Sequence, residues 1–248
     1  MGQPTTPSRG SDRFSTTQWT QVLVAVENDD PEEARKALAN LCQIYWYPLY
    51  TYIRRKGKQP ADAEDLTQGF LMRMLEKSWL DRVDQSKGKF RTFLLTCFDR
   101  YLYGEHDKVT ARKRGGGCDI VSVDWSEAES KLALAVRDER TPEEAFDLAW
   151  ATEVLRRTLE KLQEHYSETG KAHLYETLSP LLVGEAEYGQ LAEAAESLAM
   201  ESGAVRVAST RMRQKYRELL LAEVTQTVAS RETAEEEYRQ IGEILRRA

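Results

Sequence analysis

The chain has few of the residues that build metal sites, disulfide frameworks or catalytic centres. Only three cysteines and three histidines occur among its 248 residues. Cys42, Cys97 and Cys118 are odd in number and widely spaced, which excludes a CxxC-type zinc site and gives no disulfide framework. The histidines form no HExxH motif and no triad-like arrangement. We therefore expect buried or idle thiols, no metal, no cofactor and no catalytic activity.

Long apolar runs and an excess of basic residues are also absent. No stretch approaches the roughly 18 apolar residues of a membrane span, and residues 1–12 lack the apolar centre of a secretory signal. We expect a cytoplasmic protein without a membrane partner. The formal net charge of -6 and the pI near 5.4 argue against a protein that binds nucleic acid over its whole surface. Any contact with DNA has to be local.

Alternating strand patterns are nearly absent and helical patterns dominate, so the sequence predicts an all-α fold. Asp30-Pro31-Glu32-Glu33 and Thr141-Pro142-Glu143-Glu144 each place a capping residue before a proline at the first helical position. Helices are expected to begin at both. Pro48 is expected to bend or interrupt the aromatic-rich helix around it. Further helices are predicted over Thr17 to Glu27, Ala61 to Lys77 and Phe90 to Arg112.

The run Arg114-Gly115-Gly116-Gly117 is the clearest break in these helical patterns. Acidic residues dominate the weakly patterned segment that follows it, which is a linker composition. We expect two helical domains joined by a flexible linker, with a helix-turn-helix in the second. The predicted parts are a first domain at 14–115, an acidic linker at 116–140, a second domain at 141–230 and a charged terminal helix at 231–248.

Ser202 to Arg217 is the most informative segment, because it carries five cationic side chains and no acidic one in an acidic chain. Helical periodicity places Val205, Ala208, Met212, Tyr216 and Leu219 on one stripe, and Arg206, Thr210, Arg213 and Arg217 on a neighbouring one. An amphipathic run over Tyr188 to Leu198 and a turn over Ala199 to Ser202 precede it. This pattern is typical of a helix-turn-helix whose second helix enters the major groove of DNA.

Two motifs, in order, resemble those of bacterial sigma factors of the extracytoplasmic-function class. Asp62-Ala63-Glu64-Asp65-Leu66-Thr67-Gln68-Gly69-Phe70 resembles the core-binding helix of that class, and Lys89-Phe90-Arg91-Thr92-Phe93-Leu94-Leu95 resembles its next region. The likeness covers about Phe14 to Val228 and looks like a branch common in planctomycete-type bacteria. It implies that the first domain binds RNA polymerase and opens the minus-10 promoter element, and that the second reads the minus-35 element.

The resemblance also implies roles for individual residues. The positions that match polymerase-facing residues are Asp62, Asp65 and Gln68. The positions implied in binding minus-10 DNA, with the loop at 85–89 resembling one that captures an unstacked base, are Lys87, Lys89, Phe90, Arg91 and Arg100. The positions implied in binding minus-35 DNA are Arg206, Val207, Thr210, Arg211, Arg213 and Arg217. Within that last set, an arginine can hold guanine bidentately, whereas Arg213 and Arg217 are expected on phosphates.

Two departures from the family pattern concern the helix-turn-helix. The chain carries a few more residues between Leu191 and Leu198 than the first helix of that motif in the family, and Ser209-Thr210 stand where histidine is common. The promoter sequence is therefore not predicted. The acidic linker has two readings of equal weight: a segment that passes through the polymerase channels in imitation of RNA, or an unbound tether.

The leading hypothesis is an alternative sigma factor whose partners are core RNA polymerase and promoter DNA. Many relatives in that class are silenced by an anti-sigma protein or through a regulatory kinase, and the sequence favours neither. The alternative is a stand-alone helix-turn-helix regulator that binds duplex DNA without polymerase. An enzyme with a metal at Glu64 and Asp65 ranks third, because no histidine or cysteine converges on them.

Overall fold

The computed structural model describes Val22, residues 30–76, residues 90–108, Trp125, Glu129, and residues 140–182, 188–228 and 230–247. Its elements are α2 (Pro31–Arg55), α3 (Pro60–Met74), α5 (Phe90–Lys108), α7 (Pro142–Glu168), α8 (Ala172–Leu178), the 3-10 helix η1 (Ser179–Leu181), α9 (Tyr188–Ser197), α10 (Ser202–Thr225) and α11 (Arg231–Arg246). These ranges contain helices and no β-strand. The all-α prediction is confirmed.

The helix starts expected from the two proline motifs are confirmed, each with the predicted cap. The Asp30 carboxylate accepts a hydrogen bond of 3.1 Å from the Glu33 amide at the start of α2. At the start of α7, the Thr141 hydroxyl accepts from the Glu144 amide at 3.2 Å, and the Glu144 carboxylate accepts from the Thr141 amide at 2.9 Å. These bonds satisfy amides that have no partner within the helix, which fixes where each helix begins.

Pro48 does not interrupt its helix, since α2 continues through it to Arg55. A proline inside a helix costs roughly 3 kcal/mol, because it removes a hydrogen bond and crowds the preceding turn. The residues on both sides of Pro48 offset this cost, since Tyr45, Leu49 and Tyr52 are fully buried. Burial of one such side chain stabilises the fold by about 1.5–3 kcal/mol. Packing therefore keeps α2 continuous.

Two hydrophobic cores organise the described chain. The first core combines buried residues of α2, α3 and α5 with residues from three later helices: Phe146, Trp150, Ala151 and Val154 of α7, Leu220 and Val224 of α10, and Ile241 of α11. The second core is smaller and consists of Leu162, Tyr166, Leu178, Leu181, Ala194, Ala195, Val205 and Met212. The predicted second domain at 141–230 therefore contributes to both cores.

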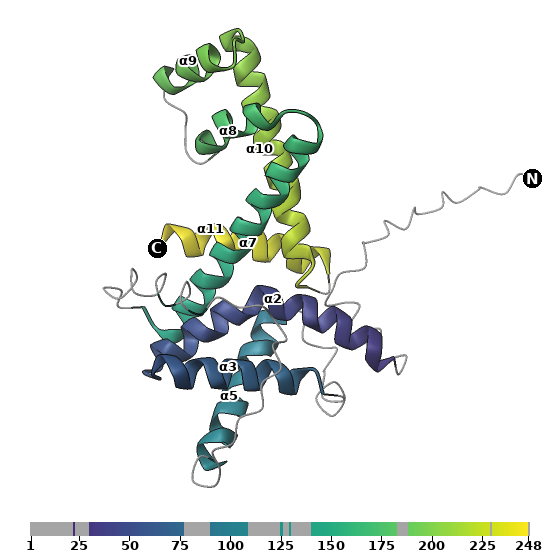
Figure 1. Ribbon diagram of the computed structural model, residues 1–248, viewed down its shortest axis with the longest axis vertical. Coiled ribbons are helices and arrows are strands. Elements are labelled where there is room, and N and C mark those ends of the chain that lie inside the picture. The colour runs from purple at the N-terminus through teal and green to yellow at the C-terminus, as the bar shows by residue number, and fades with distance from the viewer. Residues whose placement is uncertain are drawn as a thin grey trace, which may run out of the picture.

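The helices α7 and α10 connect the two cores. They run side by side along the molecule, between a bundle of α2, α3 and α5 at one end and α8 and α9 at the other (Figure 1). The first half of α7 packs against α2, whereas its second half supports the helix-turn-helix. Both ends of the molecule are consequently fixed to the same pair of helices.

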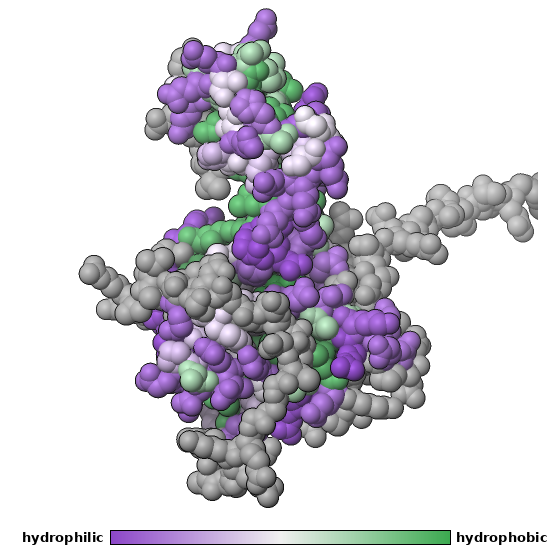
Figure 2. Space-filling model, viewed as in Figure 1, coloured by the Kyte–Doolittle hydropathy of each residue, from purple (hydrophilic) through white to green (hydrophobic). Residues whose placement is uncertain are grey.

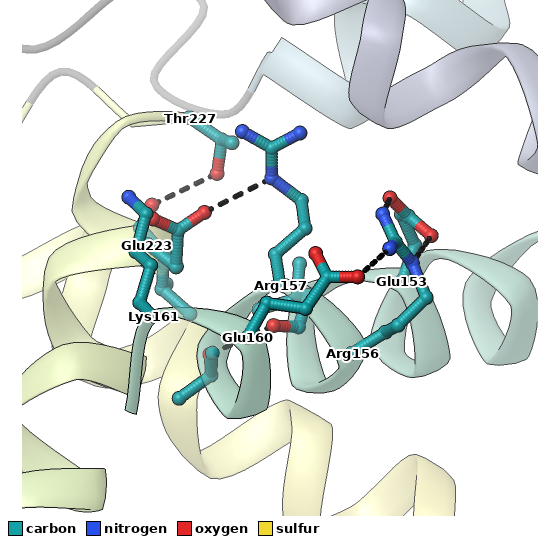
Figure 3. A network of polar contacts seen from close by, with 10 residues as sticks. Glu153, Arg156, Arg157, Glu160, Lys161, Glu223 and Thr227 are labelled. Atoms are coloured by element: carbon teal, nitrogen blue, oxygen red, sulfur yellow. Dashed lines mark hydrogen bonds and ion pairs between the residues drawn. The ribbon is translucent and has the colours of Figure 1, made fainter. Parts of the chain in front are cut away.

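A polar network ties α7 to α10 between the two cores (Figure 3). Glu223 of α10 is only 3% exposed, and its carboxylate accepts hydrogen bonds from Lys161 and, at 3.2 Å, from Nε of Arg157. A carboxylate buried this deeply is costly unless cations pair with it. Because both cations come from α7, the network fixes the register of the two helices.

Trp125 and Glu129, from the predicted acidic linker, lie against α2. The Glu129 carboxylate accepts hydrogen bonds from Nε of Arg54 at 2.7 Å and from the Tyr50 hydroxyl at 2.5 Å. The hydrogen bond from Arg54 is the main cause of a lowered pKa at Glu129. The Trp125 ring packs 5.4 Å from Trp46 and 5.2 Å from Tyr50, centre to centre. At these two residues the segment is anchored to the first core, and its other residues lie outside the described ranges.

Candidate polymerase and DNA interfaces

The turn between α9 and α10 has the hydrogen bonds of a Schellman motif. The Met200 amide donates to the Ala195 carbonyl at 3.0 Å, and the Ala199 amide donates to the Glu196 carbonyl at 3.1 Å. Ala199 adopts a φ of 49°, the left-handed conformation that this motif requires. The chain therefore forms the predicted helix-turn-helix, with an alanine at the position that usually carries glycine.

Replacing Ala199 with glycine is expected to raise the free energy of unfolding by about 1 kcal/mol, because left-handed backbone strains any residue with a Cβ. Thermal unfolding followed by circular dichroism measures the change. Gly170, which follows α7 with a φ of 69° and open space around its Cβ position, is the matched control. Gly170→Ala is expected to shift stability by a similar amount in the opposite direction. If both variants changed the free energy of unfolding in the same direction, the left-handed conformation assigned to Ala199 would be wrong.

The first turns of α10 present a buried face and an exposed face. Val205, Ser209 and Met212 are buried, the outer two in the second core. Arg206, Thr210 and Arg211 are exposed and Val207 is half exposed, so all four keep the accessibility that a base-reading role requires. The Thr210 hydroxyl donates to the Arg206 carbonyl at 2.9 Å. At the start of α10, Glu201 makes no side-chain cap, which leaves first-turn amides for another acceptor such as a phosphate.

The two remaining arginines of the predicted DNA surface lie against other parts of the protein. Nη2 of Arg213 donates to the carbonyl of Leu181 at 2.8 Å, which fastens η1 to α10. The guanidinium of Arg217 lies 5.6 Å from the ring centre of Tyr238 on α11. Arg213 is half-buried, whereas Arg217 remains exposed. Their phosphate-binding roles stay predictions, and the structure gives each a second, internal contact.

The outer face of α3 carries the residues predicted to face polymerase. Asp62 and Asp65 are exposed and Gln68 is half-buried. Their spacing places them on one side of the helix, opposite the buried residues Ala63, Thr67, Phe70, Leu71 and Met74. Hydrophilic residues also cover much of the described surface in view, and hydrophobic areas there are small and separate (Figure 2). A partner binding at α3 meets polar groups with directional hydrogen bonds.

Gly69 lies one turn after Asp65 on the same side of α3, and its lack of a side chain leaves room there for Tyr101 of α5. A Cβ at Gly69 would lie 2.6 Å from the Tyr101 hydroxyl oxygen, which is too close for a carbon atom. The Tyr101 ring also packs 5.5 Å from Phe70. Burial, followed by the charge of Glu105, raises the pKa of Tyr101 to about 12, so its hydroxyl stays neutral. The Tyr101 side chain therefore packs between α5 and α3.

Phe90 and Arg91, predicted to bind minus-10 DNA, are covered by later parts of the chain. Phe90 is fully buried with its ring 5.1 Å from Tyr45, and its amide donates to the Thr227 carbonyl at 3.1 Å. The Arg91 side chain is 11% exposed. Its Nε and Nη2 donate to the two Glu237 oxygens at 2.8 and 3.0 Å. In this arrangement both residues contact protein, and their DNA-binding role stays a prediction.

The guanidinium of Arg91 has partners from two helices that are distant in sequence. It lies 4.7 Å from the centre of the Trp150 ring and also contacts Asp147 on α7, and it contacts Gln240 on α11 besides Glu237. Burial acts to lower the pKa of Arg91, but the hydrogen bond and charge of Glu237 outweigh it and raise that pKa. Arg91 therefore stays charged.

The residues that surround Arg91 were not predicted from the sequence. One signal was available for Glu237, because it shares the inward stripe of the terminal helix with Ala234 and Ile241. A carboxylate on such a stripe indicates a cationic partner from elsewhere in the fold. Of the other predicted minus-10 residues, Arg100 is exposed on α5, and Lys87 and Lys89 lie outside the described residues.

Three further observations on the described ranges concern metal binding, a thiol and membrane crossing. No three histidine, cysteine, aspartate or glutamate side chains of those residues come together in a way that could hold a metal ion. Cys42 is buried, and burial raises the pKa of its thiol to about 12. None of the described helices combines the length and apolar character needed to cross a membrane.

One known protein family matches part of the chain, over helices of the first core. Residues 45–108 match the family described as Sigma-70 region 2, a segment that runs from the middle of α2 through α3 to the end of α5. No curated protein and no solved structure gives a match to the chain. The helix-turn-helix lies outside the matched segment. The matched segment includes the exposed face of α3, and the match supports a sigma factor of the sigma-70 family.

Proposed function

We propose that the protein is an alternative sigma factor of the extracytoplasmic-function class, from a branch common in planctomycete-type bacteria. It binds core RNA polymerase in the cytoplasm, confers promoter recognition and strand opening, and has no chemistry of its own. The observation that carries this proposal is the match of residues 45–108 to sigma-70 region 2, with the acidic outer face of α3 exposed inside it.

The outer face of α3 suits a reversible polymerase interface. Its exposed carboxylates, Asp62 and Asp65, favour a partner surface with basic or hydrogen-bond-donating groups. Polar contacts give such an interface specificity without a large apolar patch that would remain exposed after release. The Tyr101 hydroxyl lies beside Gly69 at the end of this face, so α5 borders the surface that a partner would meet.

The first turns of α10 suit minus-35 recognition. Arg206 and Arg211 are exposed on the helix that follows the turn, where an arginine can donate to O6 and N7 of guanine. The uncapped start of α10 favours a phosphate at the same end. Because the net charge of the chain is negative, this local cationic surface determines where DNA approaches.

A stand-alone helix-turn-helix regulator is the second candidate, favoured only by the exposed cationic face of α10. It gives no reason for a sigma-70 region 2 in the first core. Reconstitution with core RNA polymerase on a premelted template distinguishes the sigma factor from the stand-alone regulator. The sigma factor is expected to co-elute with core polymerase and to start transcription, whereas a stand-alone regulator does neither.

Replacing both Asp65 and Gln68 with alanine is expected to weaken binding to core polymerase about tenfold or more, since each provides hydrogen bonds to the partner. Neither is buried, so the free energy of unfolding is expected to change by about 0.5 kcal/mol or less. A titration of labelled protein with core polymerase measures the affinity. Glu76, exposed just after α3, gives the control Glu76→Ala. Wild-type affinity in the double variant would refute the interface.

Arg206→Ala is expected to relax preference at one upstream base pair by about 1–3 kcal/mol, which is the loss of one bidentate contact to guanine. Transcription from a set of promoter variants by the reconstituted polymerase measures this. Arg217→Ala is the control, because Arg217 lies beside Tyr238 at the far part of α10 and is not expected to touch bases. Unchanged base preference in Arg206→Ala would show that this helix is not the reading element.

A further inference from the structure

The helix α11 carries a buried carboxylate where its pattern calls for an apolar side chain. Ala234 and Ile241 are buried against the protein, and Glu237 between them is 1% exposed. Such a carboxylate is costly unless a cation with matching geometry meets it. Glu237 therefore selects one docking position for α11 on the basis of charge.

Arg91 is the cation that meets Glu237. Two parallel hydrogen bonds of 2.8 and 3.0 Å join the guanidinium to the two carboxylate oxygens, an arrangement that fixes both distance and orientation. Gln240, one turn along α11, contacts the same guanidinium. Apart from α11, Arg91 contacts Asp147 and the Trp150 ring, both on α7.

The segment from the end of α10 to α11 covers the start of α5. The Thr227 carbonyl accepts from the Phe90 amide, and α11 reaches the next residue through Glu237. An amide and a guanidinium at the start of a helix are groups that bind phosphate well. Here a carbonyl and a carboxylate of the same chain occupy them. The outer face of α3 stays exposed in the same structure.

We propose that α11 is an intramolecular lock over the start of α5, in which Glu237 occupies on Arg91 the place that a phosphate of the minus-10 strand takes when α11 is displaced. The proposal rests on the proposed function for the minus-10 strand. The closed chain can still meet polymerase through α3, and displacement of α11 then admits the strand. Free protein is kept from binding single-stranded DNA before it reaches polymerase.

The expected change in affinity for single-stranded DNA depends on the fraction of free chains in which α11 is docked over α5. A lock that keeps about nine-tenths of the free chain closed lowers its apparent affinity for the strand about tenfold. Glu237→Gln retains the size of the side chain and one acceptor oxygen but removes the charge. The variant is expected to bind single-stranded DNA about three- to tenfold more tightly than the wild type, up to full release of the lock.

The test uses the full chain in three forms: wild type, Glu237→Gln and Glu243→Gln. Glu243 lies on the same helix and is exposed, so its variant removes an equal charge without touching the lock. Fluorescence anisotropy with a labelled single-stranded DNA of mixed A and T bases gives the affinity. Amide hydrogen exchange gives the opening of α11 and of the first turn of α5, with the first turns of α10 as the reference.

Faster exchange confined to α11 and the start of α5, together with tighter DNA binding in Glu237→Gln alone, supports the lock. Unchanged exchange overturns it, and so does an equal rise over the whole chain, which would make the pair a general stabiliser. Faster amide exchange in α11 and the start of α5 without tighter binding of single-stranded DNA would show that Glu237 does not compete with DNA for Arg91. If polymerase binding still depends on Asp65 and Gln68 in those cases, the proposed function stands without the lock.

Discussion

Replacing Trp150 with alanine is expected to lower the free energy of unfolding by about 3–5 kcal/mol, the range for truncating a large aromatic side chain in a core. Trp150 lies on α7 but is fully buried in the first core, so its removal leaves a cavity among residues of other helices. It also removes the ring that lies 4.7 Å from the Arg91 guanidinium. The cavity and the lost contact with Arg91 both lower the free energy of unfolding.

Urea denaturation followed by circular dichroism measures this change, with Leu159→Ala as the matched control. Leu159 lies on the same helix and is 36% exposed, so its truncation is expected to cost about 1 kcal/mol or less. If Trp150→Ala costs no more than the control, α7 does not share the first core and the chain consists of two separate bodies. The expected large difference would tie residues 141–230 to the first core.

Local signals predicted the local features of the fold well. The caps at Asp30 and Thr141 form as their motifs indicate, because a capping side chain and the amide it accepts from are only three residues apart. The exposed positions Arg206 and Thr210 follow from helical periodicity, because they lie on a stripe next to the buried one through Val205 and Met212.

The sequence could not predict which distant element each face meets. Periodicity marks Trp150 as inward, but it does not distinguish a core of the second domain from the first core that Trp150 enters. Arg91 and Glu237 are separated by 146 residues, and no local rule pairs them. Arg213 likewise looks like a solvated cation until η1 is placed beside it, where Leu181 supplies a carbonyl. Arg91 and Arg213, which the sequence predicts on DNA, therefore also make internal contacts that only the folded chain shows.

The second core is small, and this makes the helix-turn-helix the more vulnerable end of the molecule. Its buried members come from the short helices α8, η1 and α9, and from parts of α7 and α10. The first core gathers more buried residues, including many aromatic ones. Local stability in a protein follows the amount of buried apolar contact. Under the proposed function, damage to the second core is therefore expected to impair promoter reading and to leave polymerase binding intact.

Met212→Ala is expected to lower the free energy of unfolding of the second core by about 2–5 kcal/mol, since Met212 is fully buried there and a truncated side chain leaves a cavity. Duplex promoter binding is expected to fail, because Arg206 and Arg211 lie on the turns that this core supports. Core polymerase binding through α3 is expected to persist, which the same titration used for Asp65 and Gln68 measures. Gln214→Ala, exposed on the same helix and outside the predicted DNA-binding set, is the control, with an expected change of about 0.5 kcal/mol. Two separate urea transitions in Met212→Ala would show that the two cores unfold separately. A single shifted transition, together with loss of polymerase binding, would show that α7 and α10 join the two cores into one cooperative unit.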